Sequence, residues 1–129
     1  MCNDSLQRAS RTPAAEVRRD GSPWTRCTPL SGQGTNPEQL FAAGYAACFA
    51  SALGLVGRQA RVDTSEVSVT AEVSIGKDGA GFGLAVVIRV ELPDALEGES
   101  GLLLVKQAHE VCPYSRATRG NIEVELVVE

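Results

Sequence analysis

The sequence contains one long apolar stretch, residues 40–56, in which almost every position carries a nonpolar or small side chain. Thr35 or Asn36 can cap a helix in front of it, Pro37 suits the first helical position, and Glu38 complements the positive end of the helix dipole. The run stays below the roughly 18 consecutive apolar residues of a membrane span. We therefore expect a helix buried in the core of a globular fold.

Two segments after this stretch alternate between apolar and polar side chains. Residues 67–75 alternate first, and residues 82–92 repeat the pattern after a glycine-rich segment at 76–81. A period of two is typical of strands with one face on a core, and the intervening segment predicts an antiparallel hairpin. Pro93 ends the second strand.

The C-terminal third predicts a second helix and a closing strand. Apolar positions between Glu99 and Val111 fall on one helical face, and Pro113 disfavours helical backbone at Cys112, where the helix should end or kink. Residues 122–128 alternate as a strand. The order of elements predicts a single α+β domain spanning residues 1–129, with helices packed on an antiparallel sheet and an irregular segment at 1–31.

Charge and cysteine content narrow the function classes. The 129 residues carry a net charge of −4, which offers no basic surface for nucleic acid or an anionic membrane. The N-terminus lacks the apolar core of a secretory signal, so we expect a cytoplasmic protein. The four cysteines are Cys2, Cys27, Cys48 and Cys112. A chain that can build its own core does not need them as disulfides, so free thiols are expected.

A reactive thiol at Cys48 would need an electrostatic partner. A free cysteine is more often a small buried hydrophobe, and burial raises its pKa. Cys48 lies about 12 residues into the predicted helix, beyond the reach of the dipole. Activation therefore requires a cation, and arginine suits an apolar site because it stays charged there when a carboxylate holds it. Glu38 is the candidate carboxylate because it lies close to three turns before Cys48, although it could simply stabilise the helix start.

Other catalytic arrangements have less support in the sequence. His109 and Cys112 have a spacing that suits zinc, but no second ligand pair accompanies them, and His109 is more readily a hydrogen-bonded helix residue. There is no Gly-x-Ser-x-Gly nucleophile motif, and no glycine-rich turn precedes a helix as a phosphate site requires.

Two segments closely resemble the active-site segments of the organic hydroperoxide resistance family, a branch of the OsmC-like superfamily. The first is residues 35–45 leading into Ala47-Cys48-Phe49, and the second is residues 111–115 followed by 117–122. The resemblance runs from about Gly32 to the C-terminus. It implies an intertwined α+β homodimer, with sheets packed on a central buried helix pair, active sites at the subunit interface, and no metal or prosthetic group.

The same resemblance implies a thiol-dependent peroxidase. Cys48 would be the peroxidatic cysteine, Cys112 the resolving cysteine, and Glu38 the acid that orients an arginine. Arg19 keeps part of the family's arginine turn but stands nearer to Glu38 than that pattern places it, whereas Arg11 fits the separation without the motif; both remain candidates. The implied substrates are alkyl and fatty-acid hydroperoxides, and the implied reductant is a dihydrolipoyl dithiol.

Two other functions remain open. The chain could be a catalytically weak relative that binds apolar molecules at a dimer interface, or a redox sensor whose disulfide alters a partner interaction. Cys2 and Cys27 lie outside both segments and are interpreted as incidental.

Overall fold

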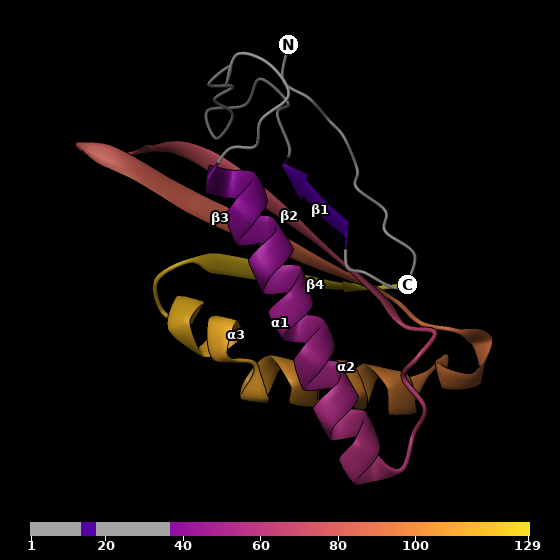
Figure 1. The fold of residues 1–129 in the computed structure, drawn as a ribbon. Coiled ribbons are helices and arrows are strands. Elements are labelled where there is room, and N and C mark those ends of the chain that lie inside the picture. Colours follow the sequence, from indigo (N-terminus) through magenta and orange to yellow (C-terminus); the bar gives the residue numbers. More distant parts are fainter. Residues whose placement is uncertain (1–13, 18–36) are drawn as a thin grey trace.

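The structure is a computed structural model, and it describes residues 14–17 and 37–129. A long helix and a second, shorter one accompany a sheet (Figure 1). The elements in chain order are β1 (Ala14–Val17), α1 (Pro37–Ala60), β2 (Ser68–Asp78), β3 (Gly81–Glu91), the 3-10 helix η1 (Asp94–Leu96), α2 (Glu99–Val111), α3 (Pro113–Thr118) and β4 (Glu123–Val128). The predicted helices, hairpin and closing strand are confirmed, and so is the α+β class.

The sheet has the order β1-β2-β3-β4 and is mixed rather than antiparallel. The hairpin β2–β3 is antiparallel as predicted, with Ala71 opposite Ile88. However, β1 runs parallel to β2, and β4 runs parallel to β3. The prediction of a wholly antiparallel sheet was wrong because helical crossovers separate these strands: α1 lies between β1 and β2, and α2 and α3 lie between β3 and β4. Such a crossover returns the chain to the end where it started, which makes the next strand parallel.

Helix α1 is the centre of the packing, since it contacts β1, β2, α2 and α3. Figure 1 shows α1 running across the sheet with its first half and crossing α2 with its second half. One stripe of α1 is buried, including Tyr45, Phe49 and Leu53. Its opposite face is not: Leu40 and Leu55 are 63% and 43% exposed, so the expected burial holds for one side of the helix within this chain.

By length and hydropathy, α1 is also sufficient to cross a membrane, because an 18-residue window within Pro37–Ala60 has a mean hydropathy of 1.7. The sequence estimate that this stretch is too short was therefore wrong. Core helices of globular proteins satisfy the same test, and 44% of this window is buried inside the protein. The packing of α1 against the sheet and α2 identifies it as the core helix of the fold.

The core face of the sheet follows the predicted alternation. In β2, Val69, Ala71 and Val73 are buried, and in β3 Val86, Ile88 and Val90 are buried. On α2, Leu104, Val105 and Ala108 complete the cluster. The exception is Glu72, which is 3% exposed and accepts a hydrogen bond from the Nε of Arg89. A buried carboxylate is tolerated there because it is paired.

Two helical glycines offer a matched test of this packing. A Cβ at Gly101 would collide with the carbonyl oxygen of Leu96 and lie 2.7 Å from Leu92 Cδ1, whereas a Cβ at Gly54 would meet only the end of the Arg58 side chain at 3.6 Å. Gly101→Ala should lower the free energy of unfolding by about 1–3 kcal/mol because backbone must move. Gly54→Ala should raise it by roughly 0.5–1 kcal/mol through helix propensity.

Urea unfolding of both variants measures these differences. Equal effects of the two substitutions would contradict the close approach of η1 to α2.

Candidate active site

The structure brings together Cys48 and Cys112, which are 64 positions apart in the chain. Their Sγ atoms lie 3.5 Å from each other, and both thiols are free. Cys112 is fully buried, while Cys48 is half-buried. Cys48 comes from the middle of α1, and Cys112 lies at the corner between α2 and α3. Two thiols in contact at this distance are positioned to exchange between dithiol and disulfide.

The corner at Cys112 follows from the proline after it. Cys112 has φ −61° and ψ 123°, an extended conformation, and it is both the C-cap of α2 and the N-cap of α3. Pro113 disfavours helical backbone at Cys112 but suits the first turn of the next helix. The Arg116 N–H then donates to the Cys112 carbonyl oxygen at 3.0 Å. Sequence reasoning predicted the break but not that the chain resumes as α3.

Aromatic side chains fix the start of α3 against α1. The Tyr114 ring stacks on Phe41 with centroids 6.3 Å apart and meets Tyr45 edge-on at 5.8 Å. A Cβ at Gly44 would lie 3.3 Å from the Tyr114 ring, so glycine there permits the close approach. The backbone N–H of Tyr114 donates a hydrogen bond to the Cys48 sulfur. The α2–α3 corner is thereby docked directly beside Cys48.

The local environment disfavours a thiolate at Cys48. Burial is the main effect that raises the pKa of the Cys48 thiol, and the adjacent Cys112 sulfur raises it further. The hydrogen bond from the Tyr114 N–H partly offsets this by lowering the pKa. Within residues 37–129 no cation contributes to the pKa of Cys48. A reactive Cys48 therefore requires positive charge from elsewhere, as the sequence suggested.

The predicted arginine and acid are only partly placed. Arg19 and Arg11 lie outside the described residues. Glu38 lies in the first turn of α1, half-buried, and forms no ion pair within the part of the chain that is described. Ten residues of helix place Glu38 about 15 Å along the axis from Cys48, too far for direct contact. Glu38 could influence Cys48 only through a side chain that spans this gap.

A buried polar cluster lies next to the thiols, and sequence reasoning missed it. The Tyr45 hydroxyl lies 2.8 Å from Ser115 Oγ and 3.3 Å from Thr118 Oγ1, and His109 Nδ1 lies 2.8 Å from Ser115 Oγ. Burial lowers the pKa of His109, and Arg119 lowers it further, while Glu110 opposes both. No sequence signal links Tyr45 to residues some 70 positions away.

These contacts also bear on the zinc alternative. His109 is a hydrogen-bonded helix residue, as the sequence favoured, since its Nδ1 is engaged with Ser115. Over residues 14–17 and 37–129, no group of three or more His, Cys, Asp and Glu side chains could hold a metal ion.

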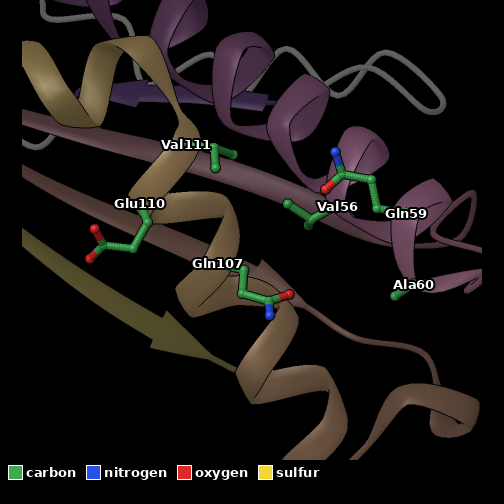
Figure 2. Close-up of a pocket in the computed structure, with 6 residues that line it drawn as sticks. All are labelled: Val56, Gln59, Ala60, Gln107, Glu110 and Val111. Carbon is green, nitrogen blue, oxygen red and sulfur yellow. The ribbon is translucent and has the colours of Figure 1, made fainter.

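A pocket of about 430 Å³ opens beside the site, between the C-terminal parts of α1 and α2 (Figure 2). Val56, Gln59 and Ala60 line it from α1, and Gln107, Glu110 and Val111 line it from α2. Val111 directly precedes Cys112, so this pocket adjoins the segment that carries the second thiol. Its walls combine aliphatic side chains with amides and one carboxylate.

Comparisons with known proteins agree on one family. The family model described as OsmC-like protein matches residues 30–127. The organic hydroperoxide resistance protein OhrA of Bacillus subtilis is 55% identical over 122 residues, covering 93% of this chain and 83% of its own. An organic hydroperoxide resistance protein of Xanthomonas axonopodis pv. citri is 51% identical over 98 residues, covering 75% of this chain and 68% of its own.

A solved structure extends the likeness to three dimensions. The crystal structure of the organic hydroperoxide resistance protein OhrB of Bacillus subtilis superposes with a TM-score of 0.70 at 46% sequence identity. The match covers 76% of this chain and 73% of that one. The helices and sheet around the two thiols thus belong to a fold already seen in proteins of that name.

The lowered pKa of His109 predicts how stability depends on pH. The unfolded pKa is about 6.5, so between that value and the lower folded pKa the unfolded chain binds the extra proton. The free energy of unfolding should therefore fall as pH decreases through this window. His109→Asn should remove this component, because His109 is the only histidine of the chain.

Urea unfolding from about pH 7.5 down to about pH 5 would measure the slope, a range in which histidine titration is resolved from most carboxylates. Identical slopes for the wild-type protein and His109→Asn would contradict the burial of a neutral imidazole.

Proposed function

The chain belongs to the OsmC-like protein family, and from this premise we propose that it is a thiol peroxidase that reduces organic hydroperoxides to alcohols. The observation that carries the proposal is the 3.5 Å contact between the free thiols of Cys48 and Cys112. The relatives' name, organic hydroperoxide resistance protein, supports the choice of oxidant.

In the first step, Cys48 acts as the nucleophile. Its thiolate attacks the terminal oxygen of the hydroperoxide, the O–O bond breaks, and Cys48 becomes a sulfenic acid. The leaving alkoxide takes up a proton and departs as the alcohol. Because burial raises the pKa of Cys48, the step requires a cation. We assign this role to Arg19 or Arg11, with Glu38 orienting the guanidinium across the length of α1 that separates Glu38 from Cys48.

In the second step, Cys112 resolves the sulfenic acid. The Cys112 sulfur attacks Cys48, a disulfide forms, and water leaves. A disulfide requires sulfur atoms about 2.05 Å apart, so the pair needs only a small approach from its present contact. No unfolding of α1 or α2 is needed to bring them together, which favours resolution over further oxidation of Cys48.

The surroundings favour an alkyl hydroperoxide over hydrogen peroxide. The Phe41 ring of α1 stacks on the Tyr114 ring, and the Tyr114 backbone N–H is hydrogen-bonded to Cys48. Val56 and Val111 line the adjoining pocket. Burial of an alkyl tail against such side chains supplies binding energy that hydrogen peroxide cannot gain. The proposal further includes a cytoplasmic homodimer, with recycling of the disulfide by a dithiol of the lipoyl type.

Three cysteine variants test the assignment. Cys48→Ser should abolish reduction of cumene hydroperoxide with dihydrolipoamide, because the attacking sulfur is lost. Cys112→Ser should still consume a first equivalent of peroxide, after which Cys48 should proceed to sulfinic acid. Cys27→Ser is the matched control and should retain turnover. The measurements are peroxide consumption and peptide mass spectrometry under non-reducing conditions.

The wild-type protein should form the Cys48–Cys112 disulfide faster with cumene hydroperoxide than with hydrogen peroxide. Unmodified thiols in the folded wild-type protein would refute the peroxidase assignment and favour the apolar-ligand binder. Turnover by Cys48→Ser would remove Cys48 from its role.

The activating cation can be identified by titration. Arg19→Ala or Arg11→Ala, whichever removes the true partner, should raise the apparent pKa of Cys48, because the thiolate loses its compensating charge. Glu38→Gln should change the pKa in the same direction but less, since it acts through the arginine. Thiol alkylation rates as a function of pH provide the measurement, and unchanged profiles in both arginine variants would exclude both assignments.

A further inference from the structure

Four polar side chains form one buried hydrogen-bonded chain where α1, α2 and α3 meet. Ser115 Oγ lies 2.8 Å from both the Tyr45 hydroxyl and His109 Nδ1, and Tyr45 also reaches Thr118 Oγ1 at 3.3 Å. Tyr45 and Ser115 are completely buried. The peroxidase steps described above use none of these side chains, yet buried polar groups are unfavourable unless each has a partner.

This chain flanks both thiols. His109 lies nearly one turn before Cys112 and Ser115 lies nearly one turn after it, on the two sides of the α2–α3 corner. Tyr45 lies nearly one turn before Cys48 on α1. Hydrogen bonds to Ser115 therefore join both arms of the corner to the helix that carries Cys48.

Each hydroxyl has only one hydrogen to donate, and this determines which group is the donor in every bond of the hydrogen-bonded chain. Thr118 Oγ1 donates to the Ser115 carbonyl oxygen at 3.1 Å, so it accepts from Tyr45. Tyr45, having donated to Thr118, accepts from Ser115. Ser115 in turn accepts from His109, whose Nδ1 must carry a proton. In the neutral ring the lone pair is then on Nε2.

We propose that this hydrogen-bonded chain positions Cys112 for attack on oxidised Cys48, with Tyr45, Ser115 and His109 as positioning residues. The inference rests on the proposed peroxidase function, because it concerns the second step of that reaction. In this step the S–O bond of the Cys48 sulfenic acid breaks, the S–S bond forms, and the hydroxyl leaves as water with the proton from Cys112.

The competing reaction shows why position matters. A second hydroperoxide molecule can oxidise the same sulfenic acid to sulfinic acid, which the dithiol does not reverse. A fixed corner raises the effective concentration of Cys112 at Cys48 and so favours the disulfide. Loss of one hydrogen bond should shift this competition without altering the first attack, in which Cys48 is the only one of the two thiols that takes part.

Tyr45→Phe tests the role of the hydrogen-bonded chain, because it removes the hydroxyl and leaves the aromatic packing intact. The rate of sulfenic acid formation should stay unchanged. Disulfide formation should slow about five- to tenfold, which corresponds to the net contribution of the 2.8 Å bond between Tyr45 and Ser115. The sulfinic fraction at excess cumene hydroperoxide should rise accordingly. Ser100→Ala is the control, since it removes an exposed hydroxyl at the far end of α2 and should match the wild-type protein.

The assignment of His109 Nδ1 as the donor to Ser115 leads to a separate prediction. His109→Asn keeps an N–H donor near the position of Nδ1, so it should retain most of the resolution rate, whereas His109→Ala should show the loss seen in Tyr45→Phe. Nitrogen-15 NMR of the single histidine should report a protonated Nδ1 and an unprotonated Nε2 at neutral pH. The opposite tautomer would overturn the assigned direction.

A measurement without peroxide separates this inference from the proposed function. The equilibrium between the Cys48–Cys112 dithiol and disulfide in glutathione buffers gives the effective concentration of the pair. It should fall about five- to tenfold in Tyr45→Phe and in Ser115→Ala, and remain unchanged in Ser100→Ala.

The outcomes are distinct. If the wild-type protein does not react with hydroperoxides but the effective concentration falls in Tyr45→Phe, the peroxidase function fails and the positioning role stands. If both variants keep the wild-type effective concentration and resolution rate, the positioning role is refuted. Should Tyr45→Phe not fold, Ser115→Ala and the His109 pair decide the question by the same two readouts.

Discussion

The arrangement of the site depends on a single backbone constraint, the steric clash with Pro113 that disfavours helical geometry at Cys112. Without it, α2 would continue through Cys112, and the side chains after it would follow the same helix axis. With it, the chain turns at Cys112 and resumes as α3. The stacking of Tyr114 on Phe41, the hydrogen bonds of Ser115 and the contact between the thiols all lie at or beyond this turn.

The same packing creates an electrostatic difficulty for Cys48. A helix that is nonpolar along most of its length stabilises the fold by removing apolar surface from water, but it also raises the pKa of a thiol placed within it. The Tyr114 backbone N–H offsets only part of this effect. Core stability thus benefits from apolar surroundings of α1, whereas a thiolate at Cys48 needs a positive charge nearby. Both requirements are met only if a cation from outside the core lies close to Cys48.

The parts of the fold that follow from local periodicity could be predicted. The alternation in residues 67–75 and 82–92 gave β2 and β3, and the stripe ending at Val111 gave α2. The strand β1 was not predicted, because residues 1–31 were expected to be irregular. The directions of β1 and β4 depend on how a helix crosses the sheet rather than on any pattern within the strand, so they could not be predicted either. Cys48 and Cys112 could be predicted as a pair because each lies in a segment that resembles a family motif. No local sequence pattern predicts the contact between Tyr45 and Ser115, which are 70 positions apart.

The two thiols lie on opposite sides of the central hairpin in the chain, one in each helical crossover. A bond between them would therefore close a loop of 64 residues that contains all of β2 and β3. Closing a loop of this length restricts the unfolded chain and stabilises the folded one by about 4 kcal/mol. Each oxidation would thus raise the free energy of unfolding, and each reduction would lower it again. The resistance of the protein to mechanical force and to proteases would therefore be higher in the disulfide form than in the dithiol form.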